Sequence, residues 1–239
     1  MYDENWASTY DHYTSIRGRI DEVDEAAAFL DRYCNGGNAL ELGVGGGRVA
    51  VPLSERGVRV DGIDNSDSML RVLAKRSDVV TPWKADIANF NSEQRYNLVY
   101  CVYNTFNLLF TREAQLACLR SSAQALGDEG TIVIEIAVPD LDGFVHGRRA
   151  STLLVDDENT ILIAEVHEPL KQNVVSTLLW FYGTSVRRLP HNIRYVYHQE
   201  LDTMAEYVGL ELAGRWEDWA RGAFSGNSKR HISVYHRRR

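Results

Sequence analysis

An acidic residue, three closely spaced glycines and a second acidic residue lie within one short stretch of the chain. Glu41 closes a short apolar run and is followed by Gly43, Gly45 and Gly47, and the next apolar run ends in Asp64. In a strand–helix–strand unit, glycines at such a turn let a ligand approach the backbone closely. An acid at the end of the second strand accepts hydrogen bonds from ribose hydroxyls. The stretch therefore predicts a nucleotide-like ligand across the top of a parallel sheet.

The glycine spacing and Glu41 together bear on which nucleotide is bound. Glycine turns also serve NAD and FAD, but this spacing is tighter than the Gly-x-Gly-x-x-Gly of dinucleotide-binding proteins. A carboxylate two residues before Gly43 suits a ligand with a positively charged end, which the pyrophosphate of a dinucleotide lacks. S-adenosylmethionine carries both a sulfonium and an ammonium. An NAD-dependent oxidoreductase is the alternative, and it requires nicotinamide binding.

Short apolar runs alternate with helix-like segments through residue 136, which favours an α/β fold with a doubly wound parallel sheet. A first helix is expected from Asp21 to the glycine pair at 36–37. Strands are expected at 39–42, 58–63, 81–85, 96–102 and 131–136, and helices at 48–56, after residue 66 and after residue 111. A helix at 200–208 and strands at 211–216 and 231–236 close the pattern.

The pattern changes between the fifth strand and the last helix. Four β-like runs are expected, at 151–155, 160–167, 174–182 and 193–197, with the Pro190-containing stretch 183–192 connecting the last two. Such hairpins predict an antiparallel β insertion. Alternating apolar residues such as Ile161 and Leu178 would bury against the main domain or against a second subunit, and we expect a homodimer.

The amino-acid composition limits which binding partners and which cellular compartment are expected. The 239 residues are 44% hydrophobic and 25% charged, and the formal net charge of −7 argues against binding nucleic acid through its phosphates. The three cysteines lack zinc spacing and are expected to be reduced thiols in a cytoplasmic protein, and no His, Asp or Glu set predicts a metal. No signal peptide and no apolar run long enough for a membrane span are apparent.

The combined motifs resemble those of the class I S-adenosylmethionine-dependent methyltransferases. The matching segments are 41–47 (ELGVGGG), 60–66 (VDGIDNS), 85–87 (ADI) and 96–109 (YNLVYCVYNTFNLL). The resemblance covers nearly all of residues 1–239 as a single domain. It implies a Rossmann-like seven-stranded sheet of order 3-2-1-4-5-7-6, with the last strand reversed, and S-adenosylmethionine as cofactor.

The resemblance also assigns cofactor-binding residues. Asp64 and Asn65 would hold the ribose, Met69 would lie against the adenine, and Asp86 with Ile87 would contact the adenine edge. From the residues alone, alternatives stay open: Asp64 as a helix cap, Glu41 as a residue that orients the glycine loop, and Asp86 as a turn residue.

Within the family, the insertion after strand five resembles that of the dTDP-amino-sugar N,N-dimethyltransferases. That likeness implies an N-terminal cap, residues 1–20, that folds over the cofactor with Tyr13 or Arg17 near the methionine carboxylate, and an insertion at about 145–198. Gly46 departs from the usual Thr or Ser of the loop. The absence of His or Tyr near Leu108 weakens the amino-sugar assignment.

Methyl transfer from a sulfonium is an in-line displacement, so the protein must chiefly align the reactants and exclude water. Tyr103 and Asn104 follow the fourth strand, where ligands of such sheets bind, or else pack under the insertion. His191 precedes the last inserted strand and is either a base or an ordinary hairpin histidine. Glu135, inside an apolar strand, is left open between a structural role and the site. The sequence predicts methylation of a nitrogen or oxygen of a small molecule; the alternative is a non-catalytic S-adenosylmethionine-binding protein.

Overall fold

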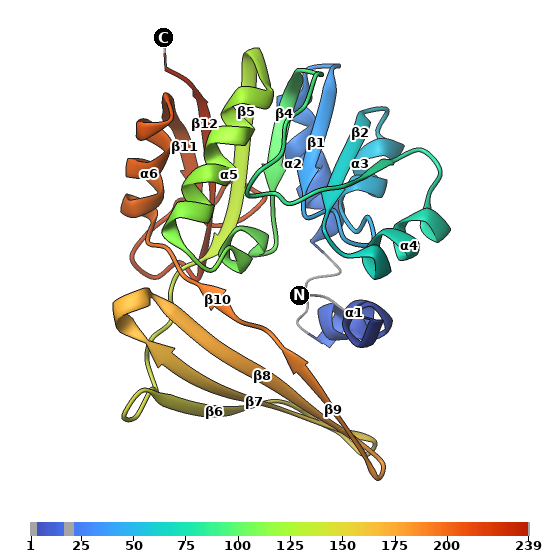
Figure 1. Cartoon of the computed structure of the whole chain (residues 1–239), viewed down its shortest axis with the longest axis vertical. Coiled ribbons are helices and arrows are strands. Elements are labelled where there is room, and N and C mark those ends of the chain that lie inside the picture. Colours follow the sequence, from blue (N-terminus) through green and yellow to red (C-terminus); the bar gives the residue numbers. More distant parts are fainter. Residues whose placement is uncertain (1–3, 17–21, 239) are drawn as a thin grey trace.

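The computed structural model describes residues 4–16 and 22–238, which form an α/β part and a separate antiparallel sheet with helix α1 beside both (Figure 1). Two sequence predictions, the start of the first helix at Asp21 and a role for Arg17, lie outside the described residues.

The α/β part is organised around a seven-stranded sheet. Its strands are β1 (Asn38–Leu42), β2 (Arg59–Asp64), β3 (Thr81–Lys84), β4 (Tyr96–Cys101), β5 (Leu126–Ala137), β11 (Leu210–Trp216) and β12 (Arg230–Arg237). Their order is β11-β12-β5-β4-β1-β2-β3. The first five strands run parallel and β12 is antiparallel to both of its neighbours. The predicted fold class, strand order and reversed last strand are therefore confirmed.

Helices cover both faces of this sheet because its central strands β1, β2 and β4 are buried on both sides. The helices are α2 (Val23–Cys34), α3 (Ala50–Glu55), α4 (Asp67–Arg76), α5 (Arg112–Ala125), α6 (His198–Tyr207) and the 3₁₀ turn η1 (Thr105–Leu108). Leu30, Leu53 and Leu73 bury α2, α3 and α4 against one face. Leu119 and Leu201 bury α5 and α6 against the other.

The inserted sheet has one strand more than the sequence predicts. It contains β6 (Arg148–Val155), β7 (Asn159–Glu168), β8 (Asn173–Tyr182), β9 (Ser185–Pro190) and β10 (Ile193–Arg194), with η2 (Pro169–Lys171) between β7 and β8. We expected the stretch containing β9 to be only a connection, and this was wrong, because β9 pairs with β8 along residues 177–182. Pro190 is tolerated because it is the last residue of an outer strand. The strand expected at 193–197 covers only two residues.

Helix α1 (Glu4–Ile16) packs against α4 and β9. Its Trp6 is fully buried in an apolar cluster with Ile161, Leu178 and Leu189 of the inserted sheet. His12 stacks on Trp180 with the ring centroids 4.9 Å apart. One face of the insertion is therefore buried against α1, the segment that the sequence predicted only as a cap without secondary structure.

The insertion is joined to the α/β part through Arg194, which is buried. Its guanidinium donates to Glu200 of α6 at 2.7 Å and to Gln172 at 2.6 Å, and it also bonds Gln115 of α5. A buried charge needs such partners. These bonds fix the β10 end of the insertion on α5 and α6.

Candidate active site

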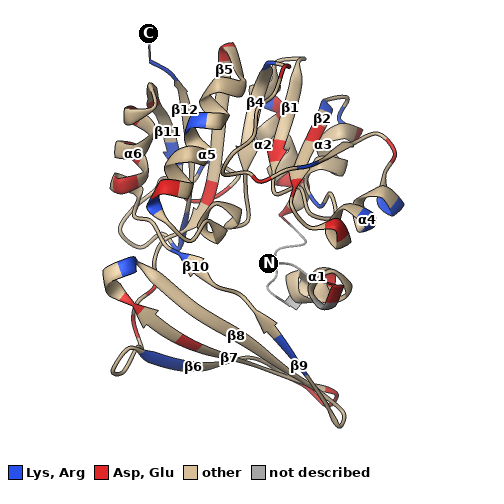
Figure 2. Cartoon of the chain, in the orientation of Figure 1, with Lys and Arg blue, Asp and Glu red and all other residues tan. Residues whose placement is uncertain are grey.

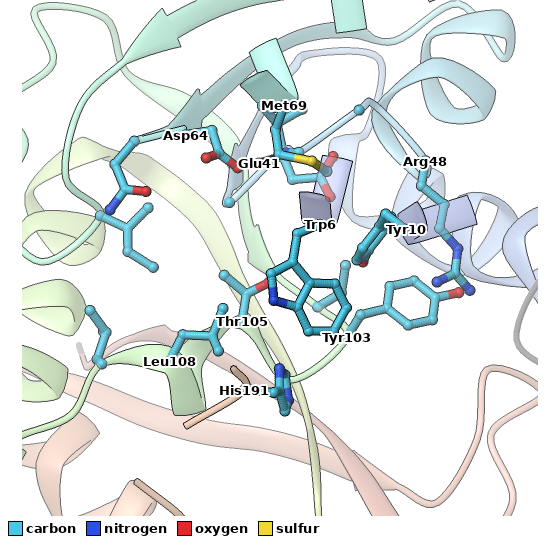
Figure 3. Close-up of a pocket in the computed structure, with 18 of the residues that line it drawn as sticks. Trp6, Tyr10, Glu41, Arg48, Asp64, Met69, Tyr103, Thr105, Leu108 and His191 are labelled. Atoms are coloured by element: carbon cyan, nitrogen blue, oxygen red, sulfur yellow. Dashed lines mark hydrogen bonds between the residues drawn. The ribbon is translucent and has the colours of Figure 1, made fainter. Parts of the chain in front are cut away.

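A cavity lies where the carboxyl ends of the parallel strands meet α1 and the insertion (Figure 3). From the α/β part its lining includes Glu41, Gly43, Gly45, Arg48, Asp64, Asn65, Met69, Asp86, Ile87, Tyr103, Thr105, Leu108 and Phe110. Trp6 and Tyr10 come from α1, Pro190 is the last residue of β9, and His191 and Asn192 lie between β9 and β10. Ligands bind at this edge of doubly wound sheets.

The glycine loop after β1 is close-packed against its neighbours. Gly43 has a φ of +75°, and a Cβ there would come within 2.3 Å of the Thr105 side chain. A Cβ on Gly46 would come within 2.9 Å of Val72 of α4. The Arg76 guanidinium also donates to the Gly46 carbonyl at 2.9 Å. A side chain at Gly46 would therefore force the Val72 side chain of α4 to shift, so the close packing of α4 favours glycine here.

Glu41 is a buried carboxyl group at the end of β1. Its Oε2 accepts a hydrogen bond from the Tyr100 hydroxyl at 3.0 Å. Burial raises the pKa of Glu41 to about 8, although the bonds from Tyr100 and the Ala50 amide act against the rise. A positively charged ligand end in the cavity would favour the ionised form. The group is thus poised to lose a proton when such a ligand binds.

Asp64 is fixed by two backbone amides. The Gly45 N–H donates to one of its carboxylate oxygens at 2.9 Å, and the Ser66 N–H donates to the other at 2.8 Å. Burial raises the pKa of Asp64, and these amides oppose the shift. The cap of α4 is instead the Ser66 hydroxyl, which accepts from the Met69 N–H at 3.2 Å. Asp64 therefore lines the cavity without serving as the helix cap, which leaves further lone pairs for a ribose diol.

The residues expected around an adenine gather on the same side of the cavity. Met69 is buried beneath the loop, and a Cβ on Gly45 would lie 3.1 Å from its Cε. Asp86 follows β3, and its Oδ1 accepts from the Ala88 N–H at 2.9 Å, so it is also a turn residue. Ile87 beside it is buried. Asn65 is exposed at the rim.

The opposite side of the cavity is largely aromatic. The Trp6 indole N–H donates to the Pro190 carbonyl at 2.8 Å, and its ring lies 5.9 Å from the His191 ring. His191 projects here because β9 and β10 are interrupted at residues 191–192, where Asn192 Oδ1 accepts the Ser176 N–H at 3.0 Å. Such an irregularity re-aims side chains next to a site.

Tyr103 and Arg48 lie together at one end of the cavity. The Arg48 guanidinium lies over the Tyr103 ring, 3.9 Å from its centroid (Figure 3). Arg48 also hydrogen-bonds the Tyr10 hydroxyl of α1. A stacked guanidinium keeps a planar set of donors suited to a carboxylate. The arrangement supplies a cation at the end of the cavity away from Asp64 and Asp86.

The structure brings most of the sequence-predicted residues into one cavity, but not all of them. Asn104 does not line it, because its side-chain oxygen accepts the Ala137 N–H at 2.6 Å. Tyr13 does not line it either and packs edge-on against Trp6, with the ring centroids 5.4 Å apart. Arg17 lies outside the described residues.

Sequence reasoning missed Trp6 and Arg48, and it placed Tyr10 only within the N-terminal segment that would fold over the cofactor. The spacing of Trp6, Tyr10 and Tyr13 at i, i+4 and i+7 is that of a helix face and was the available signal for α1. Arg48 directly follows the last glycine of the loop, so its position at the ligand could also have been inferred. Within the described residues, no group of three or more His, Cys, Asp or Glu side chains is arranged to hold a metal ion.

Comparison with known proteins identifies the family. Residues 39–130 match a family model described as a methyltransferase domain. The whole chain superimposes on the CcbJ methyltransferase from Streptomyces caelestis with a TM-score of 0.94 and 33% identity, covering 100% of this chain and 98% of the other. The chain belongs to the class I S-adenosylmethionine-dependent methyltransferases.

Two further relatives agree over nearly the full length. A cypemycin N-terminal methyltransferase from a Streptomyces species is 23% identical over 99% of this chain and 98% of its own. An S-adenosylmethionine-dependent methyltransferase from Clostridium acetobutylicum has a TM-score of 0.83 at 17% identity, with 97% and 99% of the two chains covered. The protein is therefore an enzyme that uses S-adenosylmethionine as its methyl donor, as the sequence predicted.

Proposed function

We propose that the protein transfers a methyl group from S-adenosylmethionine to an amine nitrogen of a small molecule. The observation that carries this proposal is that one cavity joins the carboxylates of Glu41 and Asp64 to a wall made by Trp6, Tyr103 and His191. Aromatic faces attract an amine and its methylated, cationic product. The name of the Streptomyces relative, a cypemycin N-terminal methyltransferase, is consistent with an amine acceptor.

The donor is held by residues on the glycine-loop side. Asp64, with Asn65 beside it, would accept hydrogen bonds from the ribose hydroxyls, and Met69, Asp86 and Ile87 would enclose the adenine. Glu41 neutralises positive charge at the methionine end. Arg48 binds the methionine carboxylate, which is the role that the sequence predicted for Tyr13 or Arg17. The fit is supported by the close-packed glycines and by the fixed orientation of the Asp64 carboxylate.

When bound, S-adenosylmethionine supplies a methyl group on a sulfonium that is already activated for displacement. The chain contributes alignment and exclusion of water: Trp6 and Tyr103 hold the acceptor, and α1 with the insertion covers it. The His191 imidazole accepts the proton that an ammonium substrate must lose before it can attack. Asn104 affects this site only indirectly, because its side-chain oxygen bonds the Ala137 amide and so orients the backbone after β4.

A paired panel of acceptors tests the proposal. Small primary and secondary amines and their matched alcohols are incubated with enzyme and donor, and S-adenosylhomocysteine release and product mass are measured. Amines are expected to gain a methyl group, with turnover reduced in His191→Gln. Methylation of the alcohols with the amines inert would overturn the choice of nitrogen.

The whole chain, residues 1–239, acts as one methyltransferase domain with the N-terminal cap 1–20 and the insertion at about 145–198. Its acceptor is a small molecule and not nucleic acid, since the net charge is −7 and both signs of charge are interspersed over both parts (Figure 2). The enzyme is cytoplasmic, in keeping with its three buried free cysteines. Among the described residues, no helix is both long and apolar enough to span a membrane.

The enzyme is a homodimer that pairs through the outer face of the insertion. That face carries Val166, Val175 and Phe181, which are 45%, 41% and 36% exposed, and Val166 lies directly opposite Val175 in the sheet. Sedimentation of the wild type and of Val175→Lys tests this. A wild-type protein that sediments as a monomer would contradict it.

A further inference from the structure

Glu135 is a carboxyl group in the middle of strand β5, with no exposed surface. Its neighbours Ile134 and Ile136 are fully apolar and also buried. Burying an ionisable group in such a strand is unfavourable unless the group is bonded. The contacts of Glu135 therefore indicate what it does, and they lead to the cavity.

One carboxylate oxygen of Glu135 accepts a hydrogen bond from the second residue after β4. The Tyr103 amide donates to Glu135 Oε2 at 2.5 Å, and the Asn104 amide donates to the Glu135 carbonyl at 3.3 Å. Tyr103 and Asn104 have φ values of +54° and +64°, which residues other than glycine rarely adopt. Such strained turns persist only where the surroundings hold them. Here Glu135 supplies the bonds that hold the turn.

The other carboxylate oxygen of Glu135 faces a fixed cation. Arg230 Nη1 lies 4.0 Å from Glu135 Oε1 and 2.5 Å from Glu22, and a second bond joins Arg230 to Glu22 at 3.0 Å. The ion pair connects β12 to the residue preceding α2. It gives Glu135 a defined orientation from the side opposite Tyr103.

The turn that Glu135 holds determines where the Tyr103 ring lies, and Arg48 rests on that ring at 3.9 Å. We propose that Glu135 is a positioning residue for the methyl donor: through the Tyr103 amide it places the Tyr103 ring, and the ring places the Arg48 guanidinium. This rests on the proposed contact between Arg48 and the methionine carboxylate. Glu135 itself does not line the cavity.

A double-mutant cycle separates positioning from a purely structural role. Binding of S-adenosylhomocysteine is measured by calorimetry for the wild type, Glu135→Ala, Tyr103→Leu and the double variant. Glu135→Ala is expected to weaken binding about tenfold, the size of one lost hydrogen bond to a charged group. In the Tyr103→Leu background the same substitution should cost no further affinity. Equal losses in both backgrounds would overturn the proposal.

Two variants serve as references. Glu135→Gln keeps an oxygen that can accept from the Tyr103 amide, so its affinity for S-adenosylhomocysteine should be within about threefold of the wild type. If Glu135 acted only through its charge, this variant would lose affinity as Glu135→Ala does. Thr131→Val replaces another buried polar residue of β5, bonded to His236, and should lower the melting temperature without changing affinity. A loss of affinity in Thr131→Val equal to that in Glu135→Ala would overturn the proposal.

A second route covers the case in which Glu135→Ala does not fold. Arg230→Gln removes the cation that orients Glu135. Its effect on S-adenosylhomocysteine affinity is measured in the wild type and in the Tyr103→Leu background. Its loss of affinity should disappear in the Tyr103→Leu background, and persistence would overturn the proposal. Failure of the wild type to bind S-adenosylhomocysteine would overturn the proposed function itself, whereas wild-type binding with additive losses would overturn only the role of Glu135.

Discussion

The cavity has a glycine-loop side, where we propose that the methyl donor binds, and an aromatic side, where we propose that the acceptor binds. These two sides, called here the donor side and the acceptor side, are assembled differently. The donor side comes largely from one stretch, in which the β1–α3 loop and the end of β2 lie next to each other because the strands pair in parallel. The acceptor side combines Trp6 of α1 with the segment around His191, which are far apart in the sequence, and Tyr103 after β4 belongs to both sides because Arg48 stacks on its ring. A local motif thus supplies most of the residues that we propose for the donor, and long-range packing supplies most of those that we propose for the acceptor. Substitutions on the two sides should therefore affect different kinetic constants.

The largest expected effect is on the donor side. Asp64→Ala removes a carboxylate that two amides hold in place, and we expect S-adenosylmethionine affinity to fall at least about 100-fold, as for loss of hydrogen bonds between a charged group and two hydroxyls. Calorimetry measures this. Asp67→Ala, an exposed neighbour paired with Lys84, is the control and should bind normally. Affinity within about threefold of the wild type in Asp64→Ala would refute the donor assignment.

Trp6→Leu tests the acceptor side. Because the indole bonds Pro190 and, in our proposal, holds the acceptor, kcat/KM for the acceptor should fall about 10- to 100-fold while donor affinity changes much less. Trp180→Leu is the matched control, since Trp180 lies in the same apolar cluster without lining the cavity. Equal losses of donor and acceptor binding in Trp6→Leu would show that the two sides are not separable.

Glu41 gives donor binding a pH dependence. Its pKa is raised to about 8, and a bound cation favours the carboxylate, so binding below pH 8 releases a proton. Affinity should rise with pH up to that value, by at most about tenfold per pH unit, and should be nearly flat in Glu41→Gln. Calorimetry in buffers of different ionisation enthalpy detects the proton. The exposed Glu25→Gln should keep the wild-type profile.

The same group affects stability with the opposite sign. A raised pKa means that the folded, ligand-free protein favours the protonated carboxyl group. Its stabilising contribution is full below the ordinary pKa of 4.5 and is lost as the pH rises through about 8. The unfolding free energy should fall over this range by at most about 1.4 kcal/mol per pH unit. Urea titrations at several pH values give the unfolding free energy of the wild type and of Glu41→Gln. The same dependence of this free energy on pH in both proteins would contradict the prediction.

The smallest effect on stability is expected at the exposed ion pair between α1 and α4. Glu4 and Arg71 pair at 3.0 Å but are 84% and 58% exposed. Glu4→Gln should change the unfolding free energy by less than about 0.5 kcal/mol, because solvent screens such pairs. A larger change in chemical denaturation would mean that charge, and not the Trp6 cluster, holds α1 in place.

The limits of sequence prediction follow the same division. The parallel sheet, the glycine loop and Asp64 were predictable because their signals are local: apolar runs, turn glycines and an acid at a strand end. Strand β9 was missed because it lies at the outside of the insertion, where only Leu189 is buried and Pro190 suggests a loop. Asn104 was assigned to the site because it follows β4, but the left-handed turn directs its amide to Ala137. No short-range pattern encodes these tertiary contacts.

A crystal structure of the enzyme with S-adenosylhomocysteine tests the central claim, that the donor and acceptor sides meet in one cavity. We predict the ribose hydroxyls on Asp64, the adenine beside Asp86 and Ile87, and the ligand's sulfur facing Trp6 and His191. A ligand whose ribose lies away from Asp64, or whose sulfur faces away from the aromatic wall, would contradict the account.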